Sequence, residues 1–128
     1  MTIQLVTASH SPALLAANLG RSPALAHLPL HVEANAPSAA VAYNRALAAT
    51  SAEIVVFLHH DVYLPQGWEA LFRARLAQLA AQDPDWALFG PFGVALDAAP
   101  IGPVWSSSLG QIVGRVPLAP VEVQVSMS

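Results

Sequence analysis

The sequence predicts an α/β domain built on an open, mostly parallel sheet with helices on both faces. The first observation is that residues 54–58 form a continuously apolar run rich in β-branched side chains. Such a run is typical of a central parallel strand that is covered on both faces. The second observation is the order of segments, β-α-β-α-β-α-β followed by β-rich sequence. This order favours parallel strands joined by crossover helices.

The N-terminal third supplies two of these strands and the helix between them. Residues 3–8 and 30–33 are short strand-like runs. Ser11 followed by Pro12 predicts a helix N-terminus, because Ser caps free backbone N–H groups and Pro fits the first helical position. We expect this helix to continue to about Leu19 and to stop at the glycine that follows.

The middle of the chain continues the alternation. Ser38 is placed to cap an Ala-rich helix that runs to about Ala49. After the apolar strand, residues 65–82 carry apolar side chains at helical spacing, which predicts a third helix. Residues 86–89 then predict another buried strand, closed by the Gly-Pro-Phe-Gly turn at 90–93.

The pattern weakens after residue 93. Proline, glycine and a run of three serines predict loop from Pro100 to Gly110. Residues 111–116 and 121–125 then predict strands, and the second of them alternates Val with polar side chains.

The composition narrows the class of protein. Hydrophobic residues make up 55% of the 128 residues and charged residues only 10%, which excludes a disordered chain. So few charges also indicate that some surface is covered, either by a partner subunit, as in a homo-oligomer, or by chain beyond this sequence. The net charge of −3 and five scattered Arg residues argue against a nucleic-acid partner. No apolar run approaches the ~18 residues of a membrane span and no signal peptide is indicated, so we expect a cytoplasmic domain.

Candidate chemistry lies where the strands end. Ligands of open α/β sheets bind beyond the carboxyl ends of the strands, which directs attention to Thr7-Ala8-Ser9, to Asn35 and to His59-His60-Asp61. If the strand remains extended through the last tripeptide, His59 and Asp61 face one way and His60 the other. An imidazole beside a carboxylate can hold a divalent cation, and the cation can neutralise a diphosphate. The alternative is that Asp61 caps a turn and the histidines only fill space.

Four segments together resemble family 2 glycosyltransferases. They are residues 41–46 (VAYNRA), 52–62 (AEIVVFLHHDV), 64–68 (LPQGW) and 86–93 (WALFGPFG). The chain is most similar to the streptomycin-biosynthesis-type branch, in which an Asn-containing helix precedes an apolar strand ending in His-Gln-Asp-Val. A Pro-x-x-Trp helix start and a Gly-x-x-Gly turn follow in that branch. The resemblance covers residues 35–93 well and residues 1–34 loosely.

The resemblance implies a GT-A fold that binds a nucleotide-diphospho-sugar donor and transfers the sugar to an acceptor that it does not identify. It implies one domain over residues 1–128, with a nucleotide-binding part at 1–93 and a partial acceptor-side β region at 94–128. In the family an acidic Asp-x-Asp motif ends the corresponding strand, and here His59 stands at its first position and Asp61 at its last. Asp61 is therefore expected to hold Mn²⁺ or Mg²⁺ against the donor diphosphate, with His59 as a second metal ligand or a ribose contact.

The resemblance also marks the nucleotide side of the cleft. Thr7, Ala8 and Ser9 match the family's first loop, which cradles the base and ribose. Asn35 matches the polar residue after the second strand, and Asn44 matches the helix Asn that lines the nucleotide side.

The catalytic residue stays unassigned. An inverting transferase needs a carboxylate as general base, but Asp97 and Glu122 are the only acids after residue 93 and neither has the family's motif context. Two classes of function therefore remain open: a metal-dependent sugar transferase, or a truncated or degenerate domain that binds a nucleotide-sugar or a partner without turnover. A metal-binding hydrolase that uses His59, His60 and Asp61 is a third, lower-ranked reading.

Overall fold

The computed structural model describes residues 1–90, 93–94, 100–101, 104–106 and 108–113. The chain divides into two compact units, of which the first contains Met1–Glu69 and the second begins at Ala70. In the described part of the chain, no helix has both the length and the apolar character needed to cross a membrane.

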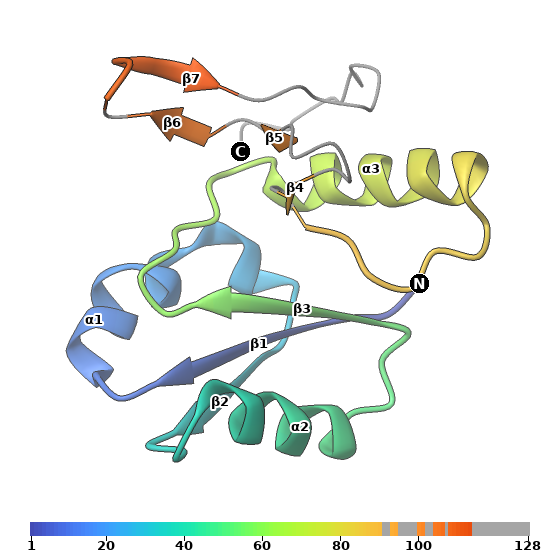
Figure 1. The fold of residues 1–128 in the computed structure, drawn as a ribbon. Helices are drawn as coiled ribbons and strands as arrows, with labels where there is room; N and C mark the ends of the chain where they lie inside the picture. Colours follow the sequence, from blue (N-terminus) through green and yellow to red (C-terminus); the bar gives the residue numbers. More distant parts are fainter. Residues whose placement is uncertain (91–92, 95–99, 102–103, 107, 114–128) are drawn as a thin grey trace. The chain divides into compact units, whose positions relative to one another are not determined.

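The first unit is built on a three-stranded parallel sheet (Figure 1). Its strands are β1 (Ile3–Ser9), β2 (Leu30–Ala34) and β3 (Ile54–His59), in the order β2-β1-β3. All three begin and end within about one residue of the predicted runs. An open parallel sheet in an α/β fold is therefore confirmed.

Helices cover both faces of this sheet. The connection from β1 to β2 contains α1 (Pro12–Ala17) and the 3₁₀ helices Leu19–Arg21 and Pro23–Ala26, and α2 (Ala39–Ala49) joins β2 to β3. The two connections cross the sheet in opposite directions, so right-handed crossovers place them on opposite faces. Figure 1 shows this arrangement, with α2 on one side of the sheet.

The predicted helix caps are confirmed. The Ser11 hydroxyl accepts from the Leu14 N–H at 3.2 Å, and the Ser38 hydroxyl accepts from the Val41 N–H at 3.1 Å. The first helix nevertheless ends at Ala17, short of the predicted Leu19. The Asn18 side-chain amide donates to the Leu14 carbonyl at 2.9 Å, so a local side-chain bond ends the helix before the glycine is reached.

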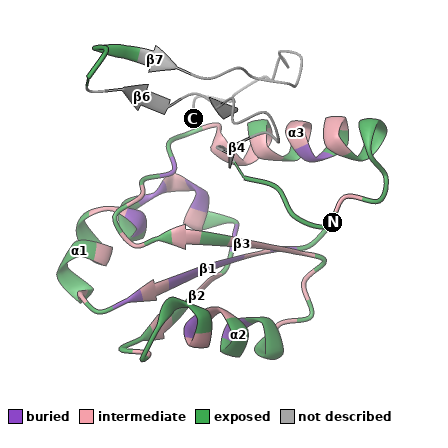
Figure 2. Cartoon of the chain, in the orientation of Figure 1, coloured by how far each residue is buried: buried purple, intermediate pink, exposed green. Residues whose placement is uncertain are grey.

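Among the described strands β1 is the central one, and residues 54–58, predicted to be central, form a strand with one described neighbour. Figure 2 shows the difference in burial: Leu5, Val6 and Thr7 of β1 are fully buried, whereas no residue of β3 is buried. Within the described residues β3 hydrogen-bonds to β1 alone. An apolar, β-branched run indicates a strand that packs on a pleated surface. It does not indicate how many other strands pair with that strand.

The second unit contains most of α3 (Trp68–Gln82), which begins three residues later than predicted. Residues 65–67 form a turn in which the Trp68 N–H donates to the Pro65 carbonyl at 3.0 Å. Of the predicted apolar stripe, Leu76 is buried and Leu71 is 40% exposed.

Residues 86–89 are not a strand, so this prediction is wrong. The Asp83 carboxylate accepts from the Asp85 N–H at 3.2 Å and the Asp83 carbonyl from the Trp86 N–H at 3.3 Å, which closes a turn. The Phe89 ring then lies 6.1 Å from Phe72 and 5.4 Å from Trp86, centroid to centroid. The aromatic residues thus find packing partners without a strand ladder.

Beyond residue 93 the described segments form two antiparallel pairs. β4 (Gly93–Val94) pairs with β5 (Pro100–Ile101), and β6 (Val104–Ser106) pairs with β7 (Gln111–Val113). The predicted loop is therefore wrong at β5 and β6, where proline and serine occur in very short strands. The predicted strand at 111–116 is confirmed as far as Val113, while 114–116 and 121–125 lie outside the described residues.

Candidate functional site

A pocket of about 290 Å³ lies at the carboxyl edge of the sheet. This is close to the lower end of the range for small-molecule sites, about 300–1,000 Å³. We call it the carboxyl-edge pocket, and it lies where ligands of open α/β sheets bind. The ends of β1, β2 and β3 and the start of α2 line it with Ala8, Ser9, His10, Glu33, Asn35, Ala36, Ser38, Ala39, Tyr43, His59 and His60.

Four of the seven site residues chosen from the sequence meet here: Ala8, Ser9, Asn35 and His59. The other three do not line the pocket. Thr7 is fully buried in β1, Asn44 is exposed on α2, and Asp61 is exposed in the turn after β3.

Ala8 lies between two polar side chains of the pocket. In the strand register it is paired with Glu33 on one side and with His59 on the other. Paired residues of parallel strands share one face of the sheet, so all three point to the same side. Two strand spacings separate Glu33 from His59, about 10 Å. The small Ala8 side chain leaves the space between them open.

The expected alternation at the end of β3 does not reach Asp61. The strand ends at His59, and the Val62 N–H then donates to the His59 carbonyl at 3.2 Å, which turns the chain. As a result His60, expected to face the other way, lines the carboxyl-edge pocket together with His59. The extended geometry assumed for the tripeptide is therefore wrong beyond its first residue.

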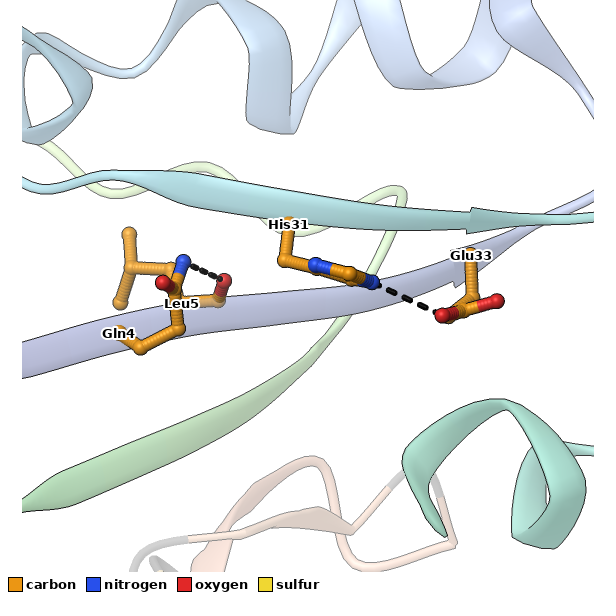
Figure 3. Close-up of polar contacts among 4 residues, drawn as sticks. All are labelled: Gln4, Leu5, His31 and Glu33. Atoms are coloured by element: carbon orange, nitrogen blue, oxygen red, sulfur yellow. Dashed lines mark hydrogen bonds and ion pairs between the residues drawn. The ribbon is translucent and has the colours of Figure 1, made fainter. Parts of the chain in front are cut away.

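Glu33 is a pocket residue that the sequence reasoning missed. Its Oε1 atom lies 2.8 Å from Nε2 of His31, two residues earlier on the same face of β2 (Figure 3). The Glu33 side chain is only 18% exposed and the His31 side chain 34%. Alternation along residues 30–33 puts His31 and Glu33 on one face, but only the register with β1 reveals that this is the face of Ala8.

Gln4, also drawn in Figure 3, fixes the start of the same two strands. Its side-chain amide donates to the Leu5 carbonyl at 3.0 Å and to the Pro29 carbonyl at 2.8 Å. The Leu5 N–H donates to the same Pro29 carbonyl at 3.0 Å. These bonds hold the register that aligns Ala8 with Glu33 farther along the strands.

Ser9 organises the histidine side of the pocket. Its hydroxyl lies 3.2 Å from the Ser11 N–H and the Ser11 carbonyl, and 2.9 Å from Nδ1 of His60. A hydroxyl has one proton, so if it donates to the Ser11 carbonyl it must accept from a protonated Nδ1. That assignment satisfies all three contacts and leaves Nε2 of His60 as an acceptor. The His10 ring packs against His60 at 5.2 Å.

Asn35 makes the bend that leads from β2 toward α2. Its φ of 54° lies in the left-handed region, which Asn tolerates better than most residues. Its N–H donates to the Ser9 carbonyl at 3.1 Å and so joins the ends of β1 and β2. The sequence identified this residue, but not the backbone conformation that shapes this wall of the pocket.

Tyr43 supplies an aromatic wall from α2. Its ring lies 4.4 Å from the Phe57 ring of β3, with 35° between the planes. Ala42 and Ala46 of the same helix are buried. Tyr43 belongs to the segment that carries the resemblance, but the resemblance indicates its neighbour Asn44, which is exposed on α2 and does not line the pocket.

Of the two residues expected to hold a metal ion, His59 lines the carboxyl-edge pocket and Asp61 does not. Among the described residues no group of three or more His, Asp or Glu side chains is arranged to hold a metal ion. Asp61 is exposed and directly follows the pocket residue His60. Ligand phosphates commonly supply the remaining oxygen atoms around Mg²⁺.

Thr7→Val is expected to stabilise the protein by about 1 kcal/mol. Thr7 is fully buried, and within the described part of the chain its hydroxyl is a buried polar group without a hydrogen-bond partner. Valine keeps the shape and removes the desolvation cost of the hydroxyl. Urea denaturation measures the change; a loss of stability would show that the hydroxyl is satisfied in solution. Because Thr7 does not line the pocket, ligand affinity should not change.

The chain was compared with family models, with curated proteins and with solved structures, and none of the three comparisons found a match.

Proposed function

We propose that the chain is a glycosyltransferase-like domain whose carboxyl-edge pocket binds a nucleotide-diphospho-sugar donor. The observation that carries the proposal is the convergence of Ala8, Ser9, Asn35 and His59 in one pocket. These residues come from three separate segments, and the resemblance in sequence indicates each of them as a donor-binding residue. The GT-A type of α/β fold and transfer of the sugar to an acceptor are parts of the same proposal.

The chain's own residues bind and orient the donor. Ser38, Asn35 and Ser9 offer polar groups around a floor of small side chains, and His59 stands at the end of β3. Asp61, exposed in the turn after β3, would hold Mn²⁺ or Mg²⁺ together with the donor's phosphate oxygens, and His59 would contact the donor within the pocket. A bound divalent ion would supply positive charge that stabilises the diphosphate leaving group.

A binding domain without turnover is the second candidate. Within the described part of the chain, Glu33 is the only carboxylate that lines the pocket, and it is hydrogen-bonded to His31. Asp97 and Glu122, the acids considered as general base, lie outside the described residues. Hydrolysis of the donor sugar at saturating concentration separates the two candidates.

Calorimetric titration of uridine and guanosine diphosphates, with and without Mn²⁺, tests the donor site. Asp61→Ala is expected to weaken Mn²⁺-dependent binding at least about tenfold, or about 1.4 kcal/mol. Asp85→Ala removes an exposed carboxylate from the second unit and is the matched control. If neither nucleotide binds, the donor-site proposal is wrong. If a nucleotide binds equally well without Mn²⁺ and in Asp61→Ala, the site does not use a metal ion and that part of the proposal is wrong.

A further inference from the structure

We propose that β2 is the contact surface between two copies of this chain, which pair their β2 strands antiparallel about a two-fold axis through Val32. β2 lies at the edge of the sheet: β1 is its neighbour on one side, and within the described residues no strand pairs with its other side (Figure 1). The pairing continues the three-stranded sheet of one copy into that of the other. This inference does not depend on the proposed function.

The backbone of β2 uses every other residue to bond to β1. The Pro29 carbonyl accepts from the Leu5 N–H at 3.0 Å, and the Asn35 N–H donates to the Ser9 carbonyl at 3.1 Å. Successive residues of a strand direct their N–H and C=O groups to opposite edges. The odd-numbered residues from 29 to 35 therefore face β1, and the even-numbered residues face the outer edge.

Three residues thus present an open ladder of backbone donors and acceptors at this edge: Leu30, Val32 and Ala34. Such a ladder is a template for a further strand, and edge strands commonly carry Lys, Pro or a bulge that prevents pairing. Residues 30–34 (LHVEA) contain neither Lys nor Pro, and their register with β1 is continuous. Val32, at the middle of the strand, is apolar and 40% exposed. The edge therefore has the composition of a strand that accepts a partner.

A two-fold axis through Val32 uses the whole strand. It pairs Val32 with Val32 of the partner subunit and Leu30 with Ala34 of the partner subunit. All outward N–H and C=O groups of these residues then bond across the axis, as in an ordinary antiparallel ladder. An axis through His31 or Glu33 would leave one outward-facing residue of each copy unpaired and would place identical polar side chains opposite each other. The backbone and the side chains therefore favour the same register.

The axis through Val32 places complementary side chains together. His31 lies opposite Glu33 of the partner subunit, in a pair without backbone bonds, where facing Cα atoms are only about 4.5 Å apart. Within one copy, Oε1 of Glu33 lies 2.8 Å from Nε2 of His31 (Figure 3). Oε2 can accept from the second imidazole, so each carboxylate meets an imidazole and not another carboxylate. Because Glu33 lines the carboxyl-edge pocket, His31 of the partner subunit stands beside that pocket.

Sedimentation equilibrium of the full chain over a concentration series tests the contact. Wild type should shift reversibly from 13.4 kDa toward twice that mass, since a strand of five residues makes a small interface. Val32→Lys places a charge at the axis and should weaken the dimer at least about tenfold. Leu14→Lys changes an apolar side chain of similar exposure on α1, 45% against 40%, and should keep the wild-type dissociation constant.

Exchange of the two polar residues tests the register. His31→Glu places carboxylates opposite each other on both sides of the axis and should weaken the dimer at least about tenfold. Combining His31→Glu with Glu33→His restores one imidazole and one carboxylate in each facing pair. The double variant should therefore recover most of the lost affinity, which a merely structural role of either residue would not produce.

Thermal unfolding of every variant confirms that it is folded. A wild type that remains monomeric at every concentration overturns the proposal. A dimer whose dissociation constant is the same in Val32→Lys also overturns it, because another surface then makes the contact. If the double variant dimerises as weakly as His31→Glu alone, the axis does not pass through Val32 and the proposed contact is wrong.

Discussion

Ala8→Leu is expected to weaken nucleotide binding about 100-fold, equivalent to about 2.7 kcal/mol. Ala8 lies between Glu33 and His59 in the strand register and lines the carboxyl-edge pocket. A leucine here would occupy pocket space that the ligand needs. The substitution adds volume to a partly exposed site, so the fold should tolerate it better than an insertion in the core.

Ala34→Leu is the matched control for this prediction. Ala34 ends β2, is paired with Ser9 and points to the other face of the sheet from Glu33. It is exposed and does not line the pocket, so the same added volume should leave affinity unchanged. Titration with uridine and guanosine diphosphates measures both variants. Full affinity in Ala8→Leu would mean that the nucleotide binds elsewhere.

Much of the first unit could be predicted because the residues that start its helices and form its strands are close together in the sequence. Ser11 and Ser38 cap their helices through bonds that span three residues, so the relevant chemistry is visible in the sequence. The three strands were likewise found from short runs of strand-forming residues. The glycine does not predict the end of the first helix, because the Asn18 side chain bonds back to the Leu14 carbonyl before the glycine is reached.

The site was partly predictable because strand ends converge in a parallel sheet. This rule brought Ala8, Ser9, Asn35 and His59 together without any knowledge of side-chain direction. It could not exclude Thr7, because each end loop contains residues from both faces of the sheet. The sequence does not identify Glu33 for the same reason, since whether its side chain lines the pocket depends on the register between β1 and β2.

Residues 86–89 show why apolar composition alone does not define a strand. They have as many large apolar side chains as a buried strand, but Phe89 packs on Phe72 and Trp86 while Leu88 remains 86% exposed. Residues 54–58 have a similar pattern and do form a strand, paired with β1. The difference lies in the available backbone partners, which are set by tertiary structure.

Leu5→Ala is expected to lower the free energy of unfolding by about 3 kcal/mol, within the usual 2–5 kcal/mol range for a buried leucine. Leu5 is fully buried in β1, the strand that has a neighbour on each side. The truncation removes apolar burial and leaves a cavity at the centre of the sheet. Because small domains have about 5–15 kcal/mol of stability, the change would be large in a urea unfolding curve.

Leu88→Ala is the matched control for the stability loss expected in Leu5→Ala. The chemical change is identical, but Leu88 is 86% exposed, so the loss should be within about 0.5 kcal/mol. A loss at Leu88 as large as that at Leu5 would mean that residues 86–89 are buried, as their sequence alone predicts. A small loss at both positions would instead contradict the assignment of β1 as the core of the sheet. The pair therefore tests burial, the property that separates these two apolar segments, independently of any ligand.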